Sequence, residues 1–488
     1  MTAITAIFTA LMHLLTAMWT TLLPSAGEQG FGSLSQGMRD RAHLYHARLL
    51  GAGSGYWHTR GNLILDQKGR AVRIQGINWY GFETVRKVPG GLTVQDYRTI
   101  LQTVKADGFN TIRLPLSNDM VEHPEVPSAI AFTSPDGTVI NRPLRGLNSL
   151  QILDRIVAYA DRVGLKVILD NHRSEAGDSA QSSGLWYTPA YPESTWIADW
   201  QTLARRYNGD STVIGVDLRN EPHNAATTGA CWSGCDAAHD WHLAAERAGN
   251  SVLAINPRLI VFVEGTDAVN NNFYWWGGNL LGVKNAPVVL KTPNQLVYSA
   301  HLYGPSEYRQ QWFNASTTDA SLEANWNRYW GYISQQNIAP VWVGEFGTSN
   351  RNDDIRSTTP GSEGQWFEAM VNYFGRNREI GWSLWALNGE DPYGLLTPDY
   401  KAPVNPLKLA ELARIMTSSD QSVMTVQKMV DVRATAGQTS SGLPSDARAI
   451  RPYRPHLPAS VLRGNVEDAD VSPQTRPETS TPDDADDH

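Results

Sequence analysis

The chain has 488 residues and a formal net charge of −8, with 41% hydrophobic and only 18% charged residues. This length accommodates one large domain of about 250 to 350 residues together with terminal extensions. No stretch of clustered Lys and Arg stands out, which excludes nucleic acid as a partner because its binding depends on neutralising phosphates. The 17 Trp are more informative, since indole rings fill cores and also stack on the apolar faces of sugar rings.

The N-terminal segment is apolar and uncharged. The first 27 residues contain no Lys, Arg, Asp or Glu. Residues 1–26 are therefore expected to be a signal peptide or an N-terminal membrane anchor, although a basic start is missing and a mis-assigned start codon would also explain them. Residues 27–55 are rich in Gly and Ser and predict a linker. We expect a secreted or otherwise extracytoplasmic protein, with membrane anchoring through residues 1–26 as one route.

Short apolar runs alternate with helical patterns through the middle of the chain. After two short strands around a turn at 67–69, the runs cover 72–79, 110–116, 165–172, 213–222, 259–265, 296–303, 340–347 and 381–388. Near-continuous apolarity is typical of parallel strands that are buried on both faces. Eight such strands with helical connections predict an α/β fold, the (β/α)8 TIM barrel, as a single catalytic domain over residues 56–418.

Four of the connecting helices have clear boundaries. They are expected over 93–108, 149–164, 196–209 and 240–256, and they stop at Gly108, Gly164, Gly209 and Pro257. Thr93 is expected to cap the first of them. The fifth connection, 266–295, is rich in Asn, Gly and Trp and only weakly helical.

The C-terminal segment loses this pattern. Residues 419–488 contain seven Pro between 444 and 482, and eight acidic residues against one Arg after position 464. Such a composition predicts a disordered acidic tail without a packed core. We expect the barrel to act as a monomer.

Two cysteines lie close together in CWSGC. Cys231 and Cys235 are candidates for a small disulfide, and two free thiols are the alternative. A structural zinc site needs four ligands, so this pair does not predict one, and no metal or other cofactor is expected. A disulfide would indicate an oxidising compartment.

Polar residues stand where the predicted strands end, and these ends meet at the catalytic face of a TIM barrel. They include Asn78, Trp79, Arg113, Asp170, His172, Asn220, Glu221, Glu264, His301, Tyr303, Glu345 and Trp385. Glu221 and Glu345 end the fourth and seventh strands. Hydrolysis of a glycosidic bond needs one carboxylic acid and one opposing carboxylate, so this pair predicts a glycosidase. Glu264 and Asp170 are interpreted as supporting residues, and Asp217 as a group of the barrel interior.

These motifs resemble glycoside hydrolase family 5, in its bacterial endoglucanase (cellulase) branch. The resemblance covers roughly residues 56–415 and rests on RLP (113–115), DNHR (170–173), RNEP (219–222), SAHLY (299–303) and GEFG (344–347), with GINWYG and YWWGGNL in support. It implies a TIM barrel that cleaves a β-glycosidic bond with retention of configuration.

The resemblance also implies roles for individual residues. Glu221 would be the general acid/base, with a raised pKa, and Glu345 the nucleophile, held ionised by Arg113 and Tyr303. The remaining substrate contacts implied by the resemblance would come from His172, Asn220, His301 and Trp385. Trp79, Trp275 and Trp276 are further candidates for stacking on sugar rings, with packing in the core as the alternative.

The expected partner is a β-glucan polysaccharide or oligosaccharide, cleaved at internal β-1,4-glucosidic bonds. A β-mannanase, xylanase, β-1,3-glucanase or transglycosylase on the same scaffold remains an alternative. A non-catalytic glycan-binding barrel would lack one catalytic Glu, and both are present.

Overall fold

The computed structural model describes residues 52–224 and 227–416. The predicted segment 1–26, the linker up to residue 51 and the tail 419–488 lie outside the described residues. Within the described part, no helix is both long enough and apolar enough to cross a membrane.

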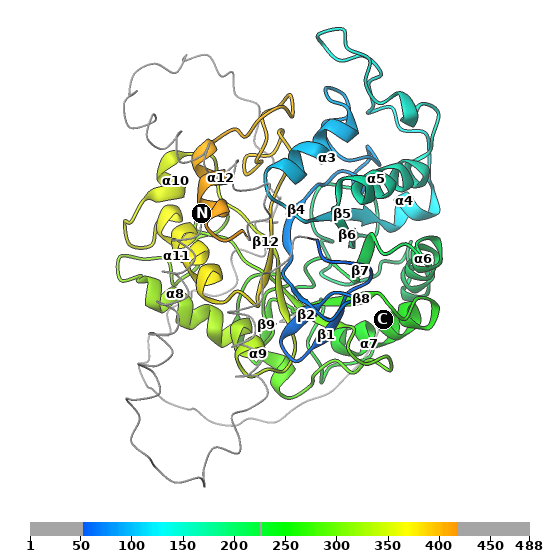
Figure 1. Ribbon diagram of the computed structural model, residues 1–488. Coiled ribbons are helices and arrows are strands. Elements are labelled where there is room, and N and C mark those ends of the chain that lie inside the picture. The colour runs from blue at the N-terminus through cyan, green and yellow to red at the C-terminus, as the bar shows by residue number, and fades with distance from the viewer. Residues whose placement is uncertain (1–51, 225–226, 417–488) are drawn as a thin grey trace, which may run out of the picture. The chain divides into compact units, whose positions relative to one another are not determined.

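The eight predicted strands form a closed parallel barrel (Figure 1). Its strands are β4 (Gln75–Asn78), β5 (Thr111–Ser117), β6 (Lys166–Arg173), β7 (Val213–Asp217), β8 (Ile260–Glu264), β11 (Leu296–His301), β12 (Val341–Phe346) and β13 (Gly381–Leu384). β13 pairs with β4 and closes the ring. Six of the strands lie within the predicted runs, and β5 and β6 extend one residue beyond theirs, so the predicted fold class is confirmed.

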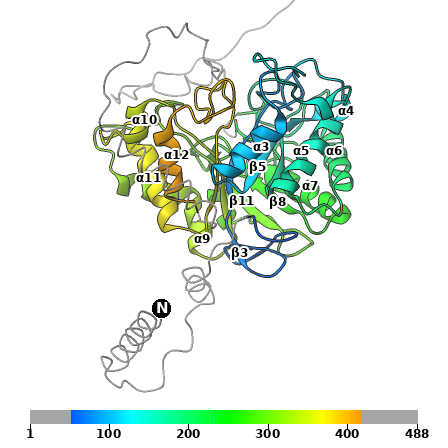
Figure 2. The same cartoon turned by 45° about the horizontal axis from the view of Figure 1, so that its top comes forward.

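The helices surround this barrel. The larger ones are α3 (Tyr97–Ala106), α5 (Ser149–Val163), α6 (Glu193–Arg206), α7 (Trp241–Ile255), α8 (Asp319–Trp326), α11 (Glu363–Arg376) and α12 (Pro406–Ala413). Shorter pieces are α4 (Asn118–Glu122), α9 (Tyr332–Gln335), α10 (Asn352–Arg356), the 3-10 helices η1 (Arg142–Leu144) and η2 (Leu281–Lys284), and the π-helix η3 (Asn327–Gly331). Figure 2 shows α10, α11 and α12 grouped on one side and α4 to α7 on the other.

Two helix boundaries show how local chemistry sets them. α5 begins with a capping box between Asn148 and Gln151 and ends at Gly164, which takes the left-handed conformation (φ 73°). This end agrees with the prediction. The predicted cap of α3 is wrong, because Asp96 rather than Thr93 caps the helix by accepting from the N–H of Arg98 at 2.9 Å.

A small antiparallel sheet accompanies the barrel before β4. It consists of β1 (His58–Arg60), β2 (Leu63–Leu65) and β3 (Ala71–Val72), one strand more than the sequence predicted. Its apolar residues join the side chains that fill the barrel interior, in a cluster of Trp57, Ile64, Val72, Ile74, Ile168, Ile214, Ile260, Phe262, Val297 and Trp342. The sheet therefore extends the interior core at the end of the barrel where strand β4 begins.

The linker prediction needs one correction. Ser54 donates its N–H to Asp66 at 3.1 Å, and Gly55 accepts from the ammonium of Lys166 at 3.0 Å. Both residues therefore contact the domain, and the packed chain begins before residue 56. The fifth connection contains only the short hairpin β9 (Ala268–Val269) and β10 (Asn272–Phe273) and the turn η2, in agreement with its weak helical pattern.

Candidate active site

Arg113 lies at the centre of the polar residues that end the barrel strands. Its guanidinium is fully buried and contacts partners from five other strands or strand ends. These are Asn78 (3.1 Å), Asp170 (3.1 Å), Asp217 (2.9 Å), Asn220 (3.0 Å), Glu264 (3.4 Å) and Glu345 (2.6 Å). A planar guanidinium has five N–H donors in a fixed fork, so one Arg can orient several acceptors around it.

Glu345 receives two strong hydrogen bonds. Arg113 Nη1 donates to Oε1 at 2.6 Å, and the Tyr303 hydroxyl donates to Oε2 at 2.8 Å. Burial and the neighbouring Glu345 carboxylate raise the pKa of Tyr303 well above its usual range, so this hydroxyl stays protonated and remains a donor. The predicted pairing of Arg113 and Tyr303 with Glu345 is therefore present, and it gives each carboxylate oxygen of Glu345 a donor.

Glu221 occupies a different environment. Burial, followed by the charge of Glu345, raises the pKa of Glu221 well above its usual range. Its backbone is in the left-handed region (φ 48°), which is uncommon for a residue with a side chain and typical of functional sites. The backbone N–H donates to Glu264 Oε2 at 2.8 Å, which holds Glu221 in this conformation. The protonated acid that the sequence predicted is thus favoured here.

The two glutamates approach closely. A carboxyl oxygen of Glu221, a carboxyl oxygen of Glu345 and a ring nitrogen of His301 all lie within 4.8 Å of one another. Retaining glycosidases place their two carboxyl groups about 5 to 5.5 Å apart, whereas inverting enzymes need about 6.5 to 9.5 Å to admit a water molecule. An approach of two carboxyl oxygens to within 4.8 Å agrees with the closer, retaining spacing.

Three buried acids support this pair. Asp170, Asp217 and Glu264 contact Arg113, and burial raises the pKa of all three carboxyl groups. One guanidinium cannot neutralise four neighbouring carboxylates, and its shortest bond goes to Glu345. These contacts agree with the interpretation of Asp170 and Glu264 as supporting residues and of Asp217 as a group of the barrel interior.

Two histidines border the glutamates. His172 Nδ1 lies 2.8 Å from Asp170 Oδ2, and its Nε2 lies 3.4 Å from the amide of Asn220. His301 lies between Glu221 (3.3 Å) and Glu264 (3.2 Å). Burial lowers the pKa of His172 to about 3 and that of His301 well below its usual range, so both rings are neutral at ordinary pH.

Trp385 presents its indole beside the reaction centre. The ring stacks with Tyr80 at a centroid distance of 5.2 Å and with His172 at 5.7 Å. Its N–H donates to Asp391 at 3.2 Å. The contact with His172 brings Trp385 together with the polar cluster, as the sequence predicted.

The other predicted tryptophans differ from one another. Trp276 is half-buried and stacks face to face on His223 at 3.6 Å, and Trp275 makes an edge contact with Tyr303 at 6.2 Å. The predicted sugar contact of Trp79 is wrong, because its ring is fully buried and donates to Gly90 O at 3.0 Å. Neighbouring side chains point to opposite faces of a strand, so Trp79 points into the helix layer when Asn78 points inward.

Sequence analysis did not identify three residues near this site. Tyr80 lies two positions after the end of β4, Tyr393 has its ring 6.1 Å from that of Tyr303, and the Glu307 carboxyl bonds the Tyr393 hydroxyl. All three lie in loops beyond the strand ends, where no period of two or 3.6 residues marks the direction of a side chain. Of the three, only Tyr80 lies within three positions of a strand end.

The predicted disulfide is present. Cys231 and Cys235 are bonded, with Cα atoms 6.6 Å apart. Together they pin the loop between β7 and α7, which carries Glu221 at its beginning.

Two groups of side chains among the described residues converge closely enough to hold a cation. They are Asp217, Glu264 and His301, and Glu221, His301 and Glu345. Arg113 bonds one or more acids in each group and already supplies the positive charge there.

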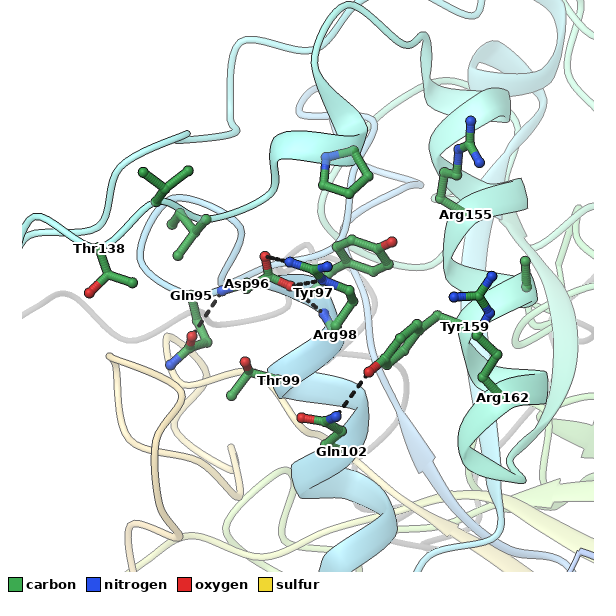
Figure 3. A pocket seen from close by; sticks show the side chains of 14 residues that line it. Gln95, Asp96, Tyr97, Arg98, Thr99, Gln102, Thr138, Arg155, Tyr159 and Arg162 are labelled. Carbon is green, nitrogen blue, oxygen red and sulfur yellow. Dashed lines mark hydrogen bonds and ion pairs between the residues drawn. The ribbon is translucent and has the colours of Figure 1, made fainter.

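A wide groove lies away from these residues, between α3 and α5 (Figure 3). It has a volume of about 550 Å³, and Tyr97, Arg98, Arg155, Tyr159 and Arg162 are among its lining residues. Its one carboxylate, Asp96, is bonded to Arg98 at 2.8 Å and caps α3. A groove without a second carboxyl group cannot perform acid-assisted displacement, so the active site is assigned to the glutamate pair at the strand ends.

The fold and the glutamate pair define a TIM-barrel glycoside hydrolase with retaining geometry. Residues 65–391 match the family model described as Cellulase (glycosyl hydrolase family 5). The chain belongs to glycoside hydrolase family 5, and it is an enzyme of the cellulase type.

Known relatives agree with this assignment. The chain is 45% identical over 367 residues to an endoglucanase of Paenibacillus polymyxa, covering 74% of this chain and 87% of that protein. It is 35% identical over 366 residues to the major extracellular endoglucanase of Xanthomonas campestris pv. campestris, covering 73% and 71%. A solved endocellulase of the archaeon Pyrococcus horikoshii superposes with a TM-score of 0.67 at 33% identity, covering 75% of this chain and 100% of that one.

Proposed function

We propose that this enzyme hydrolyses internal β-1,4-glucosidic bonds of cellulose or related β-glucans by double displacement. The observation that carries the proposal is the approach of Glu221 and Glu345 to within 4.8 Å, with Arg113 and Tyr303 bonded only to the second. The two carboxyl groups therefore lie in different environments. This difference assigns Glu221 to proton transfer and Glu345 to nucleophilic attack.

In the first displacement, Glu345 attacks the anomeric carbon while Glu221 gives its proton to the leaving glycosidic oxygen. The bond from carbon to the leaving oxygen breaks as the bond to the Glu345 carboxylate forms, giving a covalent glycosyl-enzyme. Loss of its proton leaves Glu221 charged at the moment when Glu345 has become a neutral ester. Because that neutralisation removes a repulsive charge, the pKa of Glu221 falls and it becomes a base.

In the second displacement, Glu221 takes a proton from water, and the water oxygen attacks the same carbon. The ester bond to Glu345 breaks and the carboxylate returns, stabilised by Arg113 and Tyr303. Two inversions give net retention. Nuclear magnetic resonance of fresh products should show the β-anomer first, and an initial α-anomer would contradict the proposal.

The choice of β-1,4-glucan is supported by the relatives, since those described above are named endoglucanases or an endocellulase. The test compares release of reducing ends from carboxymethylcellulose, mannan, xylan and a β-1,3-glucan by one enzyme preparation. We expect the highest rate on carboxymethylcellulose, with a rapid fall in viscosity because internal cleavage shortens chains early. A higher rate on another polymer would identify a different β-glycanase.

We also propose that the enzyme is exported and acts as a monomer on polysaccharide outside the cytoplasm. The apolar segment 1–26 and the Cys231–Cys235 disulfide support export, since disulfides persist in oxidising compartments. Expression of the full chain in a bacterial host, followed by fractionation and N-terminal sequencing, tests this. Activity confined to the cytoplasm would contradict export, and recovery in membranes would indicate the uncleaved anchor. Light scattering should give the mass of one chain.

A further inference from the structure

A buried lysine lies next to the loop that follows β13. Lys408 belongs to α12 and is 0% exposed. Burial lowers the pKa of its ammonium group to about 7, which reflects the free-energy cost of removing a charge from water. Such a group is tolerated only where hydrogen bonds and opposite charge offset this cost. The two displacements described above do not use Lys408.

Lys408 and Asp391 hold one turn of that loop from both sides. Lys408 Nζ donates to the carbonyl oxygen of Tyr393 at 2.7 Å and to Asn350 Oδ1 at 3.3 Å. The backbone N–H of Tyr393 donates to Asp391 Oδ1 at 2.7 Å. Asn350 adds a bond to the carbonyl of Gly394 at 2.8 Å. Residues 391–394 are therefore tied to α12 and to the loop after β12.

Asp391 connects this turn to the active site. Its second oxygen, Oδ2, accepts the indole N–H of Trp385 at 3.2 Å. Burial raises the pKa of Asp391 to about 6, and the positive charge of Lys408 opposes that rise. An ionised carboxylate has two acceptor oxygens, so it receives both N–H groups at once. An Asn side chain at position 391 would instead present its NH2 group to one of these two N–H donors, and that hydrogen bond would be lost.

Trp385 stacks with His172 and Tyr80, so the bond to Asp391 sets the position of the indole beside the polar cluster. The turn also carries Tyr393, whose hydroxyl lies 2.6 Å from Ser306 Oγ. The ring of Tyr393 lies 6.1 Å from that of Tyr303, the donor to Glu345. One turn thus contacts the residues on two sides of the reaction centre.

We infer that Lys408 is a positioning residue for the reaction, acting through Asp391 on the indole of Trp385. The inference rests on the proposed function, because that function places the reacting sugar beside Trp385. Lys408 sets the position of a sugar-binding surface, and its loss displaces that surface when the turn 391–394 relaxes. A displacement of about 1 Å at a reacting group lowers the rate by roughly 100-fold.

The experiment compares the wild type, K408M, W385F and the double variant K408M/W385F. Their kcat and KM are measured on a soluble cello-oligosaccharide, and melting temperatures confirm folding. We expect K408M to lower kcat by about 10- to 100-fold with KM changed less than about threefold. In the W385F background, K408M should lower kcat by less than about twofold, because the residue it positions has been replaced. The matched control is K401M, since Lys401 is an exposed lysine of the same loop, paired with Asp136.

A substrate-free readout separates this inference from the proposed function. The near-ultraviolet circular dichroism of Trp385, taken as wild type minus W385F, should shrink when the same difference is measured in the K408M background. If the wild type fails to cleave β-glucan, the proposed function fails while the dichroism still decides the role of Lys408. Equal losses of kcat from K408M in both backgrounds, or an unchanged indole signal, would overturn the inference. If K408M does not fold, K408Q replaces it in the same comparison with the same expectations.

Discussion

Glu221 and Glu345 have the same side chain, and their neighbours separate their roles. Glu345 accepts hydrogen bonds from Arg113 and Tyr303, whereas burial and the nearby charge of Glu345 raise the pKa of Glu221 and keep it protonated. The left-handed backbone of Glu221 is stabilised by the buried acid Glu264. Each role therefore depends on several contacts from other strands, and substitutions of the two residues should have different consequences.

The Glu345→Ala variant should lose turnover almost completely, because no carboxylate remains to form the covalent intermediate. Sodium azide should partly restore activity by entering the vacated space, and it should yield an α-glycosyl azide. The measurement is kcat with increasing azide, together with the anomeric configuration of the product. A β-azide, or labelling of Glu221 by a 2-fluoro glycoside, would reverse the two assignments.

The Glu221→Ala variant should lose activity on natural glucan by about 100- to 10,000-fold, the usual contribution of a general acid. It should form the glycosyl-enzyme normally from substrates with acidic phenol leaving groups, since these need no protonation. The ratio of kcat/KM for a dinitrophenyl glycoside over cellotetraose should rise strongly. An equal loss on both substrates would show that Glu221 is not the acid.

The buried Glu83 offers a test of stability against pH. Burial raises the pKa of Glu83 from 4.5 to about 8, so between these values the unfolded chain releases a proton that the folded chain keeps. The contribution of Glu83 to stability is thus present below pH 4.5 and is lost as pH rises toward 8. Relative to Glu83→Gln, the wild type should lose up to about 1.4 kcal/mol of unfolding free energy per pH unit in this window.

Urea unfolding at pH 5 and pH 8 measures this difference. The Gln side chain keeps an acceptor for the N–H of Gly81, which donates to Glu83 at 2.7 Å. Glu125→Gln, at an exposed glutamate, is the control. Parallel stability profiles for the wild type and Glu83→Gln would show that Glu83 does not titrate in this range.

At the scale of elements, the strands follow the predicted apolar runs closely, and the connections differ more. Parallel strands that are buried on both faces are almost continuously apolar. The eight strands could therefore be predicted from their apolar runs, without tertiary information. The start of α3 was misplaced by three residues, because Thr93 and Asp96 are both good caps and only the packed turn chooses between them.

Trp276 in that connection gives an element-scale prediction. Its ring stacks on His223, whose Nδ1 lies 2.7 Å from the carbonyl of Glu221, so the indole lies close to the acid. Trp276→Ala should cost about 1 to 3 kcal/mol of sugar binding, by analogy with stacking of bases on aromatic rings. The loss should appear mainly in KM for longer cello-oligosaccharides. Phe273→Ala, at an exposed aromatic residue of the same connection, is the control.

Kinetics on cello-oligosaccharides of three to six units measure this effect. A loss of kcat that is equal at every chain length would show that Trp276 supports the core and does not form a remote subsite.

At the scale of the whole molecule, one barrel carries the active site at its strand ends and the groove between α3 and α5 among its helices. A chain spanning residues 52–418 should fold and retain most of its activity on soluble glucan, because Ser54 and Gly55 keep their contacts with Asp66 and Lys166. The composition of 419–488 predicts no packed core. Circular dichroism and activity per mole, compared with the full chain, test this. Failure to fold, or loss of most activity, would show that the extensions are needed.

The sequence by itself determined the barrel, its eight strands and the two glutamates of the proposed mechanism. These features follow from local sequence patterns, because apolar runs indicate buried strands and the ends of those strands form the catalytic face. The family resemblance then assigned roles to Arg113, Tyr303 and Trp385, and the structure brings all three to the site.

Only the tertiary structure decided which of several plausible residues reach the site. Trp79 and Trp385 both end barrel strands, yet one ring points into the helix layer and the other stacks beside the reaction centre. Lys408 is 63 positions beyond Glu345 in sequence, and its link to Trp385 appears only when α12 packs against the loop after β13. The direction and the burial of these side chains depend on contacts between segments that are distant in the sequence. Neither the period of a strand nor a short motif predicts such contacts.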